Sequence, residues 1–166
     1  DVKSLEGVAA TRHKAVPTFA LPTTAGTAAE VTINYVIIDE DAKKKMVCVD
    51  PNDIPVVAIV DPELMVSIPP HLTAYQGFDA FFHAAEGFIA NCATPISDLY
   101  ALEAIRLIYK YLPVAVADGK NLKARAKIAW ASTLAGMVEA TSSCTSEHSL
   151  EHAMSAYYPQ LPHGAG

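Results

Sequence analysis

The stretch from residue 56 to residue 83 reads VVAIVDPELMVSIPPHLTAYQGFDAFFH, and it contains the point where one kind of structure gives way to another. Its first five residues form a continuous apolar run, which is typical of a strand buried on both faces. Asp61 and Pro62 follow with the residue types of a helix N-cap and a first helical position, so they predict a short helix. Pro69 and Pro70 then mark a joint, because prolines interrupt regular elements and stiffen linkers.

The composition differs on the two sides of this joint. Residues 1–70 are rich in β-branched residues, proline and turn signals, whereas residues 71–166 are rich in alanine, leucine and helical periodicity. We therefore expect two domains, or parts of them, that meet at residue 70. In the first part we expect strands at 18–21, 32–38, 45–49 and 56–60, the middle two forming a hairpin, and a helical turn at 27–30. In the second part we expect helices at 73–91, 95–111, 122–141 and 146–157, with Pro113 just beyond the end of the second.

Bulk properties exclude several classes of protein. Of the 166 residues, 51% are hydrophobic and 18% are charged, which predicts a packed core rather than disorder. The net charge of -6 argues against a nucleic-acid partner. No apolar run reaches the length of a membrane span, and the first residues lack the features of a signal peptide. Cys48, Cys92 and Cys144 form no CxxC pair, so we expect free thiols and a cytoplasmic protein.

A first candidate for chemistry is the segment GFDAFFHAAEGF at residues 77–88. Asp79 and His83 are four residues apart, so a helix places them on one face, where a carboxylate and an imidazole could bind a divalent metal. The apolar neighbours require these polar groups to be paired. A plain hydrogen-bonded Asp/His pair satisfies the same requirement, and this pattern alone leaves both interpretations open.

A second candidate is the segment HSLEHAMSAYYPQLPHG at residues 148–164. His148 and His152 share one helical face, and His163 follows in a Pro-His-Gly turn. Two antiparallel helices and a turn could bring these histidines to Asp79, which would give a site of one Asp and three His suited to Fe(II) or Zn. A helix surface on which the histidines lie beside Glu147 and Glu151 is the alternative, and spacing does not separate the two.

The loop PTTAGT at residues 22–27 is a third candidate. Its small residues would let backbone N–H groups approach an anionic phosphate, and Thr23, Thr24 and Thr27 could add hydroxyl donors. The spacing fits neither a Walker motif nor GxGxxG, so an ordinary strand-to-helix connection explains the loop equally well.

Taken together and in order, PTTAGTAAEVT, VAIVDPEL, GFDAFFHAAEGF and HSLEHAMSAYYPQLPHG resemble the iron-containing, group III alcohol dehydrogenases. The first half is most similar to the lactaldehyde reductase (propanediol oxidoreductase) branch of that family. The resemblance covers essentially the whole chain. It implies a dehydroquinate synthase-like architecture, in which part of an α/β dinucleotide-binding domain (residues 1–70) precedes the first part of an all-α metal-binding domain (residues 71–166).

The resemblance also implies roles for individual residues. The metal ligands for Fe(II) or Zn would be Asp79, His83, His148 and His163, and His152 would be the catalytic residue beside the metal. NAD(P) would contact Thr23, Thr24, Thr27, Lys45 and Leu64. The spacing from His148 to His163 is one residue longer than in the lactaldehyde reductase branch, and we expect the turn at 158–161 to absorb it.

The resemblance implies hydride transfer between NAD(P) and a small primary alcohol or aldehyde, in a homo-oligomer with no nucleic-acid or membrane partner. The glycine-rich pyrophosphate segment and the later metal-domain helices of the family are not in this sequence, so we expect a central piece of such an enzyme. Two alternatives stay open: an inactive fragment, in which the run at 56–60 would expose an apolar edge, and a related zinc enzyme of the glycerol dehydrogenase or dehydroquinate synthase type.

Overall fold

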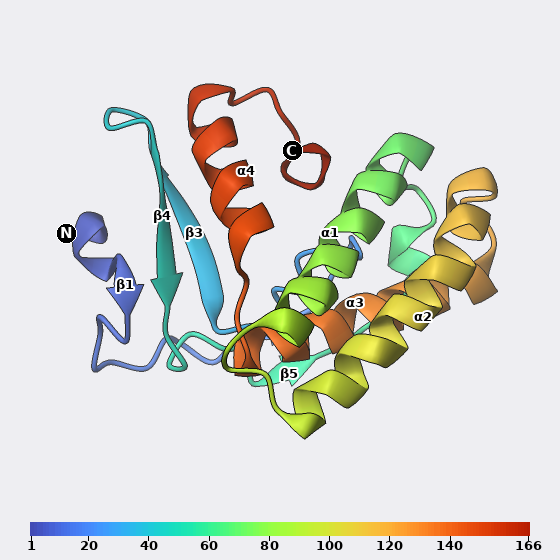
Figure 1. Ribbon diagram of the computed structural model, residues 1–166, viewed down its shortest axis with the longest axis horizontal. Helices are drawn as coiled ribbons and strands as arrows, with labels where there is room; N and C mark the ends of the chain where they lie inside the picture. Colours follow the sequence, from blue (N-terminus) through green and yellow to red (C-terminus); the bar gives the residue numbers. More distant parts are fainter.

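Three long helices pack against one another on one side of the computed structural model, which describes residues 1–166 (Figure 1). Local sequence sets where each helix begins. Pro70 is the first residue of α1 (Pro70–Ile89), a position that needs no N–H donor. Thr94 and Ser97 form a reciprocal capping box at the start of α2 (Pro95–Ala117). Asn121 accepts a hydrogen bond from the Ala124 N–H at the start of α3 (Leu122–Thr141).

Small side chains hold these helices close together. The buried core contains nine alanines of α1, α2 and α3 that are at most 2% exposed, namely Ala80, Ala84, Ala101, Ala104, Ala115, Ala124, Ala129, Ala131 and Ala135. Gly77 of α1 adds to this, because a Cβ built there would lie only 2.3 Å from Leu112 Cδ1 of α2. None of the helices is both long enough and apolar enough to cross a membrane.

The prediction that α2 ends before Pro113 is wrong. The helix continues to Ala117 with Pro113 inside it. A proline in a helix removes one backbone hydrogen bond, but Leu112 and Ala115 on either side of it are buried against the neighbouring helices. Tertiary packing therefore overrides the local stop signal. The other predicted helices agree with the structure, except that α1 begins three residues and ends two residues earlier than expected.

The predicted hairpin is present on the opposite side of the molecule (Figure 1). Strand β3 (Asn34–Asp39) pairs antiparallel with β4 (Lys44–Val49), with Asn34 opposite Val49. The short strand β1 (Gly7–Val8), which follows the 3-10 turn η1 (Val2–Leu5), adds to the other edge of β4 in parallel. The sheet order is thus β1-β4-β3.

The apolar run at residues 56–60 differs from the expectation of a strand buried on both faces. Only β5 (Val57–Ala58) is a strand, and it pairs in parallel with β2 (Phe19–Ala20) alone. Val56 and Ile59 are 61% and 46% exposed, because this sheet has two strands and nothing in the chain covers it. The alternative expectation of an exposed apolar edge is therefore confirmed. The short helix predicted at Asp61 is η2 (Pro62–Met65), capped by the Asp61 carboxylate.

The loop between β2 and β3 lies against the helices. No helix forms at residues 27–30, but a single hydrogen-bonded turn forms one residue further on, where the Val31 N–H donates to the Ala28 carbonyl at 3.0 Å. Side-chain hydrogen bonds from α3 hold this loop. The Ser132 hydroxyl donates to the Gly26 carbonyl, and the Thr133 hydroxyl donates to the buried Glu30 carboxylate. Gly136 of α3 allows this approach, because a Cβ there would meet Ala28 Cβ at 2.4 Å. The last elements, α4 (Ser146–Tyr157) and η3 (His163–Ala165), lie between the hairpin and α1 (Figure 1).

Candidate metal centre

Helix α1 supplies two buried members of the candidate centre. Asp79 and His83 are 5% and 2% exposed, and they project from adjacent turns of one face, as their spacing predicts. His83 Nε2 lies 3.7 Å from Asp79 Oδ1. The other carboxylate oxygen of Asp79 accepts a hydrogen bond from the Thr27 hydroxyl at 3.3 Å. The loop that contains Thr27 therefore helps to orient the aspartate.

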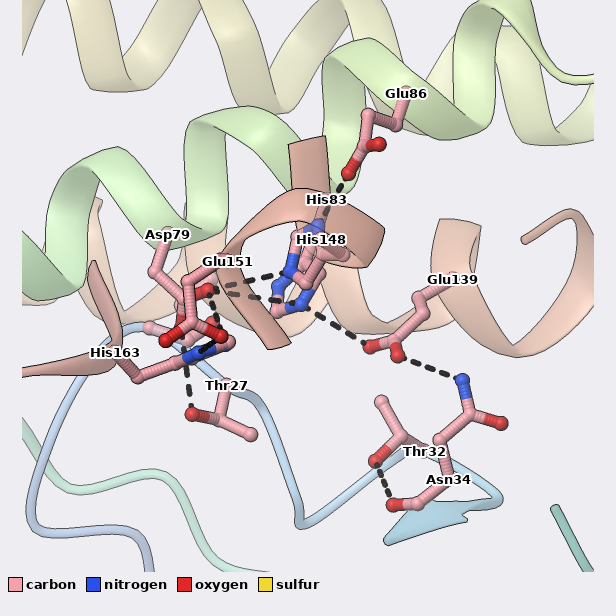
Figure 2. Close-up of polar contacts among 12 residues, drawn as sticks. Thr27, Thr32, Asn34, Asp79, His83, Glu86, Glu139, His148, Glu151 and His163 are labelled. Carbon is pink, nitrogen blue, oxygen red and sulfur yellow. Dashed lines mark hydrogen bonds and ion pairs between the residues drawn. The ribbon is translucent and has the colours of Figure 1, made fainter. Parts of the chain in front are cut away.

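Helix α4 supplies His148, and a buried glutamate of α1 holds it in place. Glu86 Oε2 contacts His148 Nδ1, while Glu86 Oε1 accepts hydrogen bonds from the backbone N–H groups of Thr145 and Glu147 and from the Thr145 hydroxyl. One carboxylate thus caps the N-terminus of α4. It also orients the imidazole, a contact drawn in Figure 2. His148 Nε2 then points to Asp79 Oδ1 at 3.5 Å.

The Pro-His-Gly turn supplies His163. Its Nε2 lies 3.4 Å from Asp79 Oδ1, and its Nδ1 lies 2.5 Å from Glu151 Oε2 of α4. Gly164 permits this position, because a Cβ there would come within 2.1 Å of the Tyr75 carbonyl oxygen on α1. The turn therefore presses directly against α1, and the extra residue in the spacing does not keep His163 from the cluster.

The three imidazoles consequently face a single carboxylate oxygen. Their Nε2 atoms lie 3.4–3.7 Å from Asp79 Oδ1 (Figure 2). Ligand atoms that share one ion at about 2.1 Å in a tetrahedral arrangement are separated by about 3.4 Å. His148 Nε2 is also buried without a hydrogen-bond partner. Buried polar atoms are rarely left unpaired. Asp79, His148 and His163 lie within 4.8 Å of one another and so fit a divalent metal ion, and His83 reaches the same oxygen of Asp79 at 3.7 Å.

The charges around the cluster support the same conclusion. Four carboxylates surround it, those of Asp79, Glu86, Glu139 and Glu151, and the one lysine beside them is Lys45. Burial and the negative charges of Glu139 and Glu86 raise the pKa of the Cys144 thiol far above its usual range. Burial disfavours charge of either sign, but the part of this rise that comes from Glu139 and Glu86 reflects negative charge that a bound cation would offset.

The histidines respond to these carboxylates in the metal-free protein. Burial alone would lower the pKa of His148, but Asp79 and Glu86 raise it to about 9. Burial alone would raise the pKa of Asp79, but contacts with His148 and His163 and the charge of His83 lower it well below its usual range. The pKa of His163 is raised, chiefly by its contact with Asp79. Metal binding at this cluster therefore has to displace protons.

A cavity of about 710 Å³ opens between the β3–β4 hairpin and the helices beside the cluster. Among its lining residues are six of the predicted site residues, which are Thr27, Lys45, His83, His148, His152 and His163. The structure does not bring every predicted cofactor contact to this cavity. Thr23 and Thr24 are exposed on their loop, and Leu64 of η2 is 41% exposed; none of the three lines it.

Three glutamates in and around the cluster were not predicted. The sequence could have indicated Glu86, because this residue lies three residues after His83 and seven after Asp79 on the same buried face of α1. No sequence pattern indicated Glu151 or Glu139. Glu151 depends on the turn that brings His163 to it, and Glu139 of α3 reaches the site from another element, with Oε2 3.5 Å from His83 Nε2.

Comparison with known proteins agrees with this fold and identifies the family. Residues 2–62 match the sequence profile of iron-containing alcohol dehydrogenases, and residues 73–166 match that of the C-terminal part of the Fe-containing alcohol dehydrogenase family. The chain belongs to the iron-containing alcohol dehydrogenase family. The family resemblance noted from the sequence is thereby confirmed.

Individual relatives show how much of such a protein the chain represents. It is 45% identical to lactaldehyde reductase of Escherichia coli strain K12 over 164 residues, which is 99% of this chain and 42% of that protein. It is 42% identical to the NAD-dependent methanol dehydrogenase of Bacillus methanolicus over 98% of this chain and 42% of that protein. The chain thus spans less than half the length of these relatives.

The chain also covers less than half of the solved structures that it matches. A crystal structure of 1,3-propanediol oxidoreductase superposes with a TM-score of 0.94 and 41% identity, covering 99% of this chain and 43% of that one. Sulfoacetaldehyde reductase from Bifidobacterium kashiwanohense, crystallised with NAD+, matches with a TM-score of 0.85 and 42% identity over 91% of this chain and 40% of that one.

Proposed function

We propose that the protein is a metal-dependent alcohol dehydrogenase, or aldehyde reductase, that transfers hydride between NAD and a small primary alcohol or aldehyde. The observation that carries this proposal is the cluster in which Nε2 of His83, His148 and His163 faces Oδ1 of Asp79 at the wall of a large cavity. The family's name favours Fe(II) as the ion, and zinc suits the same donors. Relatives described as NAD-dependent or crystallised with NAD+ favour that nucleotide.

In this proposal Asp79, His83, His148 and His163 hold the ion. When bound, the ion would supply a Lewis acid for the substrate oxygen and the nicotinamide would supply or accept the hydride. The protein's own residues position these groups and handle the proton. Thr27 fixes Asp79, and Glu86 fixes His148, so the donor atoms are already arranged before the ion binds.

His152 is the residue that we propose to move the proton. It lines the cavity, and its ring centre lies 6.3 Å from that of His148 and 5.7 Å from that of His163. Burial and the charge of Lys45 lower the pKa of His152. A neutral imidazole at pH 7 can accept a proton as the alcohol is oxidised and return it when the aldehyde is reduced.

The same proposal assigns the two parts of the chain to two domains. Residues 1–70 would belong to a nucleotide-binding domain and residues 71–166 to the first part of a helical metal-binding domain, with the cavity between them. Lys45 of β4 and Thr27 line that cavity and are the proposed nucleotide contacts. A nucleotide site that includes Thr23, Thr24 and Leu64 would need further chain outside residues 1–166 to complete it. A cytoplasmic homo-oligomer is part of the same proposal.

The test uses the full natural protein, purified without oxygen. We expect about one iron per chain by elemental analysis, and oxidation of NADH that depends on a small aldehyde such as propionaldehyde. His163→Ala should abolish both the bound metal and the activity, whereas His71→Ala, which changes a histidine outside the cluster, should abolish neither. Retention of stoichiometric metal by His163→Ala would exclude this ligand set. Metal binding without any aldehyde-dependent NADH oxidation would exclude the reaction and favour an enzyme of another type.

A further inference from the structure

Glu151 lies where the hairpin, α4 and the candidate metal centre meet. It is 5% exposed, although it follows an exposed leucine on a short helix near the end of the chain. Oε2 lies 2.5 Å from His163 Nδ1, and Lys45 Nζ donates to Oε1 and Oε2 at 3.2 Å and 3.1 Å. Figure 2 shows the Glu151 carboxylate beside the His163 imidazole, which also contacts Asp79.

The ion pair between Lys45 and Glu151 is much less exposed to solvent than the ion pair next to it. Their side chains are 11% and 6% exposed, whereas those of the neighbouring pair, Lys44 and Glu6, are 55% and 38% exposed. Lys44 and Lys45 point to opposite faces because side chains alternate along a strand. Solvent screens the outer pair, but it has little access to the inner one, so removal of either inner partner leaves a charge uncompensated.

His163 is the histidine that most needs such support. Its side chain is 30% exposed, against 3% for His83 and 11% for His148, and it stands on a turn rather than in a long helix. A carboxylate that accepts the Nδ1 proton fixes the tautomer and leaves the Nε2 lone pair facing Asp79. Glu86 does this for His148 and is itself anchored by backbone N–H groups. Glu151 has no backbone anchor of that kind, and Lys45 takes its place.

We propose that Glu151 is a positioning residue of the metal centre, which orients His163 and is itself held by Lys45 of the hairpin. The proposal rests on the proposed function in one respect, namely that a metal binds at this cluster. Its consequence is that the strand β4 and the metal are linked through Lys45, Glu151 and His163. A displacement of Lys45 would therefore reach the metal even though lysine does not ligate it.

The experiment measures the affinity of the chelator-stripped full natural protein for Co²⁺, by calorimetry and by the visible absorption of the bound ion. Glu151→Ala should weaken binding about 10–100-fold, the range typical for a residue that orients a ligand. Glu151→Gln should weaken it less and shift the absorption bands, because the amide still accepts a hydrogen bond. Lys45→Met should also weaken binding, but it should add little to Glu151→Ala in the double variant.

Two matched controls separate this role from a general loss of charge. Lys44→Met changes the adjacent lysine and Glu147→Gln changes an exposed glutamate of the same helix, so both should leave the Co²⁺ affinity and spectrum unchanged. Circular dichroism checks that each variant is folded. Wild-type affinity and an unshifted spectrum in both Glu151 variants would overturn this proposal alone. Fully additive losses from Lys45→Met and Glu151→Ala would overturn the link to Lys45, and a wild-type protein that binds no Co²⁺ would overturn the proposed function as well.

Discussion

Glu86 of α1 and His148 of α4 form a buried carboxylate–imidazole pair that joins the two helices at the metal centre. The same carboxylate accepts hydrogen bonds from two backbone N–H groups at the start of α4, those of Thr145 and Glu147. The helix and its histidine therefore depend on a single side chain that is 1% exposed.

The first prediction concerns the removal of this carboxylate. Glu86→Ala should lower the free energy of unfolding by about 3 kcal/mol, because it leaves the His148 imidazole and the part-buried donors at the start of α4 without their acceptor. It should also weaken metal binding, since α4 loses its anchor. Urea denaturation of the chelator-stripped protein measures the first effect. Glu147→Gln, on the exposed side of α4, is the control, and a change below about 0.5 kcal/mol in Glu86→Ala would contradict the anchoring role.

The second prediction is a loss of metal-free stability at alkaline pH. The pKa of His148 rises from 6.5 to about 9 in the folded protein, so its contribution is fully present below pH 6.5 and is lost as the pH rises through 9. The pKa of Glu86 falls from 4.5 to about 2, so its contribution is present above pH 4.5 and is lost as the pH falls through 2. The pair therefore stabilises the metal-free protein most between pH 4.5 and 6.5.

Thermal unfolding in the presence of a chelator, measured from pH 5 to pH 9.5, tests this dependence. We expect the melting temperature to fall toward pH 9 in the wild type. It should fall less in Glu86→Gln, because the charge of Glu86 no longer raises the pKa of His148. The metal-loaded protein should lack this decline, because a histidine that ligates a metal is already neutral. A metal-free wild type with a flat profile across this range would show that the pair is not charged.

The elements that sequence predicted correctly are those with local signals. Pro95 after Thr94, and Asn121 before α3, fix helix starts through their own backbone and side-chain chemistry. The prediction that α2 ends before Pro113 was wrong for the opposite reason, since packing against other helices decides where that helix ends. The same division holds in the site: spacing placed Asp79 and His83 together, whereas Glu139 reached them only through the packing of α3 on α1.

The third prediction concerns the packing of Ala28, the residue after the PTTAGT loop, on α3. Gly136→Ala should cost about 1–3 kcal/mol of stability, because the new Cβ would lie 2.4 Å from Ala28 Cβ, which has no rotamer to relieve the contact. Ala28 has a φ of 53°, a conformation that glycine adopts without strain. Ala28→Gly should thus recover part of the loss in the double variant while having little effect alone. Denaturant unfolding of the four proteins measures this, and a Gly136→Ala protein as stable as the wild type would refute the close contact.

The last prediction rests on the proposed reaction and concerns the charge of the substrate. Glu139 lines the cavity, where Oε1 accepts a hydrogen bond from Asn34 Nδ2 at 2.6 Å and Oε2 faces His83. Glu139→Gln keeps an acceptor for Asn34 but removes one negative charge. At about 6 Å and an effective dielectric constant of about 40, that charge repels an anionic substrate by about 1.4 kcal/mol.

Glu139→Gln should therefore raise kcat/KM for glyoxylate, relative to neutral propionaldehyde, about tenfold. Steady-state NADH oxidation with both aldehydes at low ionic strength gives the ratio, and added salt should reduce the difference, because ions screen the charge. Glu103→Gln removes the same charge from α2, outside the cavity, and should leave the ratio unchanged. An unchanged ratio in Glu139→Gln would mean that the carboxylate does not face the substrate, and that its role is confined to holding β3 against α3 through Asn34.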